Sequence, residues 1–199
     1  MSTAALQRRT LWLAGFVALC WLVLGLDAIV PGSFAEFGVR PRQVDGLRGV
    51  LFAPFLHGNA AHLASNSVPL LALGALVLIA DARHFVAVTA CVVVCSGLGA
   101  WLLGPPQSVH IGASGVVFGY LGYLLFHGWF TRHIGMMLLS IVVAGVWGGL
   151  VFGVLPGTPG VSWQSHAGGF VGGVAAARYF AKRPAVKRPA AQRRKPASR

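Results

Sequence analysis

The chain has 199 residues, of which 56% are hydrophobic and only 10% are charged. Soluble domains typically carry about 25% charged residues, so this composition excludes an ordinary soluble globular protein. The formal net charge of +12 is concentrated at one end, because eight of the sixteen lysines and arginines lie in the last eighteen residues. That placement argues against a nucleic-acid-binding surface, and we expect no nucleic-acid partner.

Several apolar stretches reach the roughly 18–20 residues that cross the hydrocarbon core of a bilayer. Glycine, proline or charged residues separate them, as is typical of turns between helices. We therefore predict an all-α fold, a polytopic bundle of six transmembrane helices near 11–30, 60–80, 84–103, 112–130, 134–155 and 164–181. These helices form one membrane domain, 11–181, between a short N-terminal segment, 1–10, and a basic tail, 182–199. We expect residues 31–59 to form a structured loop that lies at the interface or enters the bilayer in part.

The positions of lysine and arginine predict the orientation. With the N-terminus in the cytoplasm, thirteen of the sixteen fall on the cytoplasmic side, and only Arg40, Arg42 and Arg48 fall outside. This positive-inside bias places both termini in the cytoplasm, in a multi-pass protein of the plasma (inner) membrane. The tail is rich in proline and alanine, and we expect it to be disordered and to lie against anionic lipid of the cytoplasmic leaflet. An alternative explanation of these basic residues is a tail that is solvated and contacts no specific lipid, and whose positive charge only sets the orientation of the chain in the membrane.

Four polar residues fall at one depth, near the outer ends of three helices. His62 and Asn66 are four residues apart and share one face of the second helix, whereas Ser114 opens the fourth helix and His166 the sixth. Polar side chains at membrane depth are costly and are candidates for function. A lone serine there usually bonds to a carbonyl one turn earlier, and a lone histidine can join two helices. Four such residues at one level favour a site.

Glycines supply the close packing that such a site needs. Two small-xxx-small pairs let helix backbones approach closely, and they are Gly115 with Gly119 and Gly169 with Gly173. A close crossing of the fourth and sixth helices would carry Ser114 to His166. An imidazole within hydrogen-bond reach can take the proton of a serine hydroxyl. The Asn66 amide, the His62 ring and backbone amides near Ser114 are suitable donors to a developing oxyanion.

Other chemistries find less support in the sequence. The four acids, Asp27, Glu36, Asp45 and Asp81, all precede the fourth helix, so serine catalysis here would use a Ser–His dyad with the imidazole oriented by another group. The sequence contains no HExxH motif, so nothing in it indicates a zinc protease, and we expect no metal or other cofactor. An aspartyl protease needs two membrane aspartates, and only Asp27 is a candidate. Three cysteines, Cys20, Cys91 and Cys95, fit best as small buried hydrophobes.

The segments HGNAAHLASN, GASG and HAGG together resemble the rhomboid family of intramembrane serine proteases, over roughly residues 45 to 180. The resemblance implies a serine endopeptidase that hydrolyses peptide bonds in or near transmembrane helices of other membrane proteins. It implies that Ser114 is the nucleophile, that His166 is the general base, and that His62 and Asn66 stabilise the oxyanion. The resemblance also marks positions that are structural or support the site, and they are Arg48, His57, Gly112, Gly115, Phe118, Gly169 and Gly173.

The sequence departs from the family pattern at two places. Leu47 replaces the tryptophan of the Trp-Arg motif in the first outer loop, which predicts a looser loop. Phe118 stands where the family often has an aromatic residue with a hydroxyl, so it can stack on His166 but cannot donate a hydrogen bond. His110, four residues before Ser114, lies outside the pattern, and we place it in the outer loop that precedes the fourth helix.

Two alternatives remain at this stage. One is a rhomboid-like protein that binds membrane clients without cutting them, although such relatives typically lose the serine or the histidine that this chain keeps. The other is a small transporter with histidines along its path. The absence of recognisable repeated halves and the clustering of polar groups at one end argue against a transporter.

Overall fold

The computed structural model describes residues 3–158 and 160–181, and within them every regular element is a helix. The long helices are α1 (Thr3–Asp27), α3 (Ala60–Asp81), α4 (Phe85–Leu103), α5 (Ser114–Thr131), α6 (Ile134–Trp147) and α7 (Trp163–Ala181). Short helical segments join them: η1 (Phe34–Phe37), η2 (Asp45–Arg48), α2 (Gly49–Phe52), η3 (Ala53–Phe55) and η4 (Gly148–Val154). The predicted all-α class is confirmed. The predicted basic tail, 182–199, lies outside the described residues.

Each predicted helix coincides with an observed one, but two boundaries differ. The first helix begins at Thr3 rather than near residue 11. Alanine, leucine, glutamine and arginine are strong helix formers, so the backbone stays helical beyond the apolar stretch that marked the predicted start. The predicted helix 134–155 is α-helical only as far as Trp147 and continues to Val154 as the 3₁₀ segment η4.

Four of the long helical segments are long and apolar enough to cross a membrane, judged over the described residues by length and composition. They are Leu6–Asp27, Ala60–Asp81, Phe85–Leu103 and Ile134–Val154. Helices α5 and α7 fall short of that hydropathy; α5 is enclosed by the other helices, and α7 packs closely along α4 and α5. Twelve of the eighteen residues of α5 are buried, whereas α6 buries only Ser140 and Val143. A helix enclosed by other helices does not need the apolar surface that lipid requires of an outer one.

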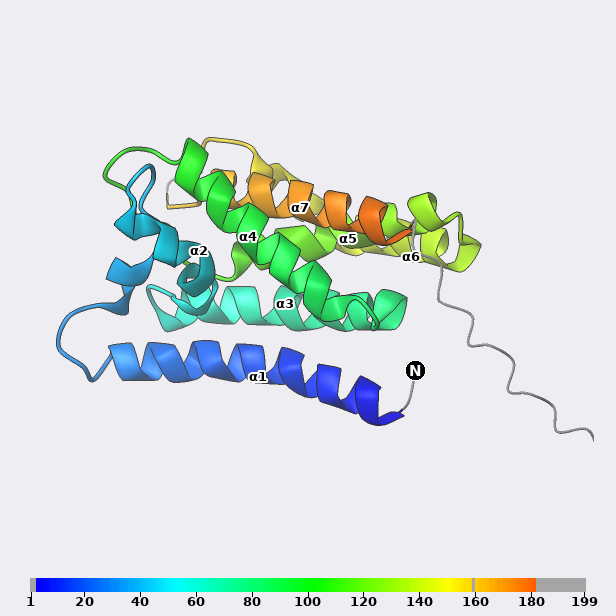
Figure 1. Ribbon diagram of the computed structural model, residues 1–199, viewed down its shortest axis with the longest axis horizontal. Coiled ribbons are helices and arrows are strands. Elements are labelled where there is room, and N and C mark those ends of the chain that lie inside the picture. The colour runs from blue at the N-terminus through cyan, green and yellow to red at the C-terminus, as the bar shows by residue number, and fades with distance from the viewer. Residues whose placement is uncertain (1–2, 159, 182–199) are drawn as a thin grey trace, which may run out of the picture.

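The long helices run alternately up and down, as Figure 1 shows. Helix α5 is central and packs against α3, α4, α6 and α7, while α1 lies at one side against α3. The start of α1 and the end of α7 lie at the same end of the bundle, and residues 31–59 lie at the opposite end, beside the starts of α3 and α5.

Residues 31–59 are fixed to the end of α4, although Leu47 replaces the family's tryptophan. The Trp101 indole N–H donates to the Gln43 carbonyl over 2.8 Å. The Arg42 guanidinium donates to the carbonyls of Leu102 and Gly104, over 3.0 and 2.9 Å. The two Arg42 bonds satisfy carbonyls that the end of α4 leaves without partners, and all three bonds hold the first loop against α4.

Candidate active site

Ser114 begins helix α5 at a sharp turn. Gly112, two residues earlier, has φ of +113°, a conformation that residues with a Cβ rarely adopt. Its N–H donates to the Ala53 carbonyl over 2.8 Å, and a Cβ at this position would lie 3.0 Å from the His62 ring. The glycine therefore lets the chain pass close to α3 and turn directly into the helix that carries Ser114.

The close crossing of α5 and α7 brings Ser114 and His166 together. A Cβ added at Gly169 would meet the carbonyl oxygen of Gly115, and one added at Gly173 would meet that of Gly119. Backbone therefore touches backbone at both levels, as the paired glycines predicted. At the end of this crossing, the His166 Nε2 atom lies 2.8 Å from the Ser114 Oγ atom.

A backbone carbonyl determines which nitrogen of His166 carries the proton. The Nδ1 atom lies 2.9 Å from the Gly153 oxygen in η4. A carbonyl oxygen only accepts hydrogen bonds, so Nδ1 must be the donor. In the neutral ring, Nε2 is then the acceptor, and the Ser114 hydroxyl donates to it. This is the tautomer that a general base toward serine requires.

Phe118 holds the imidazole from one side. Its ring stacks on that of His166 with centroids 4.0 Å apart and planes inclined by 9°. Gly153 leaves room for this stack, because a Cβ there would lie 2.6 Å from the Phe118 ring and 3.4 Å from the His166 Nδ1 atom. The His166 ring is thus fixed by Ser114, by Gly153 and by Phe118.

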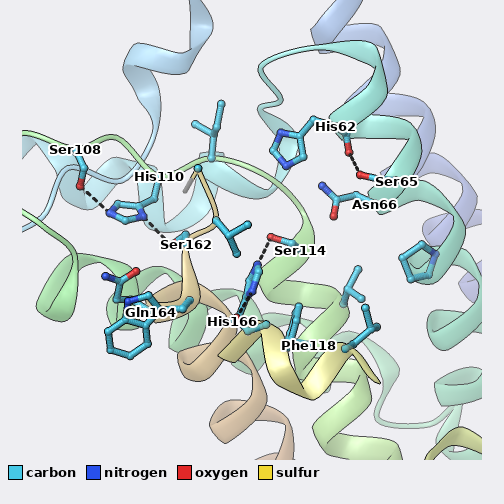
Figure 2. A pocket seen from close by; sticks show the side chains of 18 of the residues that line it. His62, Ser65, Asn66, Ser108, His110, Ser114, Phe118, Ser162, Gln164 and His166 are labelled. Atoms are coloured by element: carbon cyan, nitrogen blue, oxygen red, sulfur yellow. Dashed lines mark hydrogen bonds between the residues drawn. The ribbon is translucent and has the colours of Figure 1, made fainter. Parts of the chain in front are cut away.

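A cavity of about 940 Å³ opens beside the pair and is drawn in Figure 2. Helix α3 contributes His62, Ser65 and Asn66 to its lining, and α5 contributes Ser114 and Phe118. The opposite wall comes from η4 and from the segments that lead into α5 and α7. None of the four acids of the chain lines this cavity.

Asn66 presents an unused donor to this cavity. The residue is 7% exposed, and its Nδ2 atom is buried with no hydrogen-bond partner among the described residues. Buried donors are normally paired, so an unpaired one that faces a cavity is consistent with a ligand atom as its partner. His62 lies one turn earlier on α3 and also lines the cavity. Figure 2 shows both side chains on the side of Ser114 opposite the labelled residues of the α7 segment.

His57 and Arg48 both lie outside the cavity lining. The His57 Nε2 atom accepts the Ala113 N–H over 3.2 Å, which braces the turn before Ser114. Burial, with a smaller contribution from nearby His62, lowers the pKa of His57 to about 4 and so keeps this ring neutral. Arg48 lies over the Phe37 ring at 4.7 Å and donates to the Glu36 carbonyl, so its contacts are within the first loop.

Two features of the site have no signal in the sequence motifs. One is the Gly153 carbonyl, since every residue has a carbonyl and nothing in the local sequence marks this one. The other is a hydrogen bond of 2.7 Å between Ser96 of α4 and Ser165 of α7, which fixes the residue beside His166. Serines are common in membrane helices, so only the folded arrangement identifies this pair.

Comparison with known proteins identifies the family. A Rhomboid domain model matches residues 45–183. An uncharacterized protein of Mycobacterium tuberculosis is 41% identical over 205 residues, which cover 96% of this chain and 85% of that protein. An uncharacterized protein of Mycobacterium leprae is 40% identical over 185 residues, which cover 86% of this chain and 73% of that protein. With the helical bundle and its apolar helices, these matches show that the chain is an integral membrane protein that belongs to the rhomboid family.

Proposed function

We propose that this protein is an intramembrane serine endopeptidase that hydrolyses peptide bonds in or near the transmembrane helices of other membrane proteins. The observation that carries the proposal is the pair of contacts on His166, with Ser114 at 2.8 Å on one nitrogen and the Gly153 carbonyl at 2.9 Å on the other. This arrangement supplies both a nucleophile and an oriented base. The non-catalytic alternative gives no reason for this geometry.

The first half of the reaction makes an acyl-enzyme. The Ser114 oxygen attacks the carbonyl carbon of the scissile peptide while its proton passes to the His166 Nε2 atom. The carbonyl oxygen becomes an oxyanion, and the Asn66 amide and His62 ring face the cavity from α3 as its donors. The imidazolium then gives its proton to the leaving nitrogen, the C–N bond breaks, and the amine product departs.

Water completes the cycle. A water molecule gives its proton to the His166 Nε2 atom and attacks the ester carbon. The Ser114 oxygen leaves and takes the proton back from the imidazolium, which releases the new carboxyl end of the substrate. In both halves of the reaction the Gly153 carbonyl accepts a hydrogen bond from the His166 Nδ1–H group, and this bond stabilises the transient positive charge on the ring.

The arrangement of helix ends supports an outward-facing site. Arg40, Arg42 and Arg48 lie on the segment at the site end of the bundle, whereas the other described arginines lie near helix ends at the opposite end. Under the positive-inside rule, the site end faces outward, six helices cross the bilayer and both termini are cytoplasmic. A substrate helix that unwinds near the outer face would then present its backbone to Ser114.

A serine-reactive fluorophosphonate tests the proposal, together with cleavage of a model transmembrane substrate by purified protein in detergent. We expect labelling and cleavage by the wild type and neither by Ser114→Ala. Ser65→Ala is the matched control, because Ser65 lines the same cavity but, among the described residues, its hydroxyl bonds only to the His62 carbonyl. We expect this control to keep both activities. Cleavage by purified Ser114→Ala would exclude serine catalysis, and an inert wild type would favour the client-binding alternative.

A further inference from the structure

His110 is a buried histidine outside the Ser114–His166 pair, and both of its ring nitrogens have partners. It lies in the segment between α4 and α5 and is 8% exposed. Its Nδ1 atom is 2.6 Å from the Ser162 Oγ atom, and its Nε2 atom is 2.9 Å from that of Ser108. Figure 2 shows both contacts at the far side of the cavity from α3.

The neighbouring hydrogen bonds determine the direction of each contact. The Ser108 hydroxyl donates to the Pro105 carbonyl over 2.7 Å, so its oxygen must accept from the His110 Nε2 atom. In the neutral ring, Nδ1 then accepts, and the Ser162 hydroxyl donates to it. The Ser162 oxygen remains free to accept the Ser165 N–H over 3.3 Å. Burial lowers the pKa of His110 below its ordinary value and so favours this neutral form.

This set of bonds joins three segments that are far apart in the chain. The backbone of His110 exchanges two hydrogen bonds of 2.9 Å with Val39 of the first loop. Its ring holds Ser162, whose hydroxyl accepts an N–H of the first turn of α7 as an N-cap residue does. The Ser162 carbonyl accepts the His166 N–H over 3.1 Å, so the capped turn is the one that carries His166.

We propose that His110 is a positioning residue that fixes the first turn of α7, and with it His166, against the segment that leads into Ser114. Only three residues separate His110 from Ser114, so its ring links the approaches to both members of the pair. Loss of this link would leave α7 anchored by its glycine crossing and by the Ser96–Ser165 bond, but would loosen the N-cap at Ser162 and so let the first turn shift. This inference rests on the proposed function, since it assigns His110 a part in the reactivity of Ser114.

Two substitutions distinguish the effect of the hydrogen bonds of His110 from the effect of the size of its ring. His110→Leu fills a similar space and removes both hydrogen bonds. His110→Asn keeps an acceptor near the Nδ1 position, to which the Ser162 hydroxyl can still donate. His127→Leu is the matched control, because His127 is 7% exposed on α5 and stacks on Tyr123. It lies thirteen residues after Ser114, about 20 Å along the helix at 1.5 Å per residue.

The rate of fluorophosphonate labelling of Ser114 and the kcat for cleavage are measured well below each variant's melting temperature. We expect His110→Leu to lower both by roughly 10- to 100-fold, because displacements near 1 Å have effects of this size. KM should change far less than kcat. His110→Asn should recover most of the loss, and His127→Leu should stay near the wild-type rates even where its melting temperature falls.

Hydrogen–deuterium exchange gives a second readout that needs no activity. We expect the amides of residues 162–166 to exchange faster in His110→Leu than in the wild type, with protection restored in His110→Asn. If His110→Leu is labelled, and its amides exchange, at the same rates as in the wild type, the inference is overturned while the proposed function stands. An equal loss of labelling in His127→Leu would overturn it too, because general destabilisation would then explain the effect. A wild type that does not label would overturn the proposed function and, with it, this role of His110.

Discussion

The Nδ1 atom of His166 donates to the carbonyl oxygen of Gly153 over 2.9 Å, and this bond stands where many serine hydrolases use a carboxylate. Gly153 lies one residue before the end of the 3₁₀ segment η4, and carbonyls in the last turn of a helix lack partners within it. A helix end therefore supplies the acceptor that orients the imidazole. No acid is required near the site.

Gly153→Ala tests the importance of this geometry. An added methyl group would press on the Phe118 ring, at 2.6 Å from its nearest atom, and Phe118 stacks on His166; its distance of 3.4 Å from the His166 Nδ1 atom is an ordinary contact. We expect labelling of Ser114 to fall by about 10- to 100-fold through misplacement of the base. Gly148→Ala, at the other end of η4, is the control, because a Cβ there meets nothing within 4 Å. Equal labelling of the two variants would show that the stack and the carbonyl contact tolerate displacement.

Asn66→Ala tests the oxyanion assignment. Removal of one preorganised donor typically lowers the rate by on the order of 10²–10³, and we expect the kcat for peptide cleavage to fall by that amount. The Nδ2 atom has no hydrogen-bond partner in the part of the chain that the structure describes, so the melting temperature should change little. His62→Ala is measured alongside. Full activity in both variants would show that α3 takes no part in stabilising the oxyanion, although the Ser114–His166 pair could still act.

Gly169→Val tests the close crossing of α5 and α7. Its side chain would collide with the Gly115 carbonyl, and overpacking of this kind typically costs about 1–3 kcal/mol. We expect a lower melting temperature and a loss of labelling, because separated helices would part Ser114 from His166. Gly145→Val, on α6 in open space, should do neither. Similar mild effects at both positions would mean that this crossing is not what brings the pair together.

The pH dependence of stability reports on His57. Its pKa is lowered from 6.5 to about 4, chiefly by burial. Between these values the unfolded chain binds a proton that the folded protein does not, so stability falls as the pH falls through this window. His57→Gln keeps an acceptor for the Ala113 N–H and removes the titration. We expect its melting temperature to depend less on pH between 6.5 and 4 than that of the wild type. An identical dependence would show that His57 is not held neutral.

The sequence predicts what depends on side-chain type and spacing. Apolar stretches placed the helices, and the glycine pairs indicated the crossing that joins Ser114 to His166. Helix boundaries were less predictable, because Arg8 and Arg9 end the apolar stretch but continue the helix. The acceptor that orients His166 could not be predicted, since it is a backbone atom whose position depends on where η4 ends. The contact between His110 and Ser162 could not be predicted either, since Ser162 lies fifty-two residues away in the chain.

The two helices that carry Ser114 and His166, α5 and α7, are the two long helices that lack the hydropathy of a membrane span. Their glycines and polar residues make the close crossing possible, and the same residues weaken partition into lipid. Insertion of α5 should therefore depend on the helices that follow it in the chain, α6 and α7, against which it packs. We expect a chain truncated after α5 to translocate that helix in microsomes, so that a glycosylation site placed after α5 is modified there and unmodified in the full-length chain. An unmodified glycosylation site in the truncated chain would show that α5 enters the bilayer without α6 and α7.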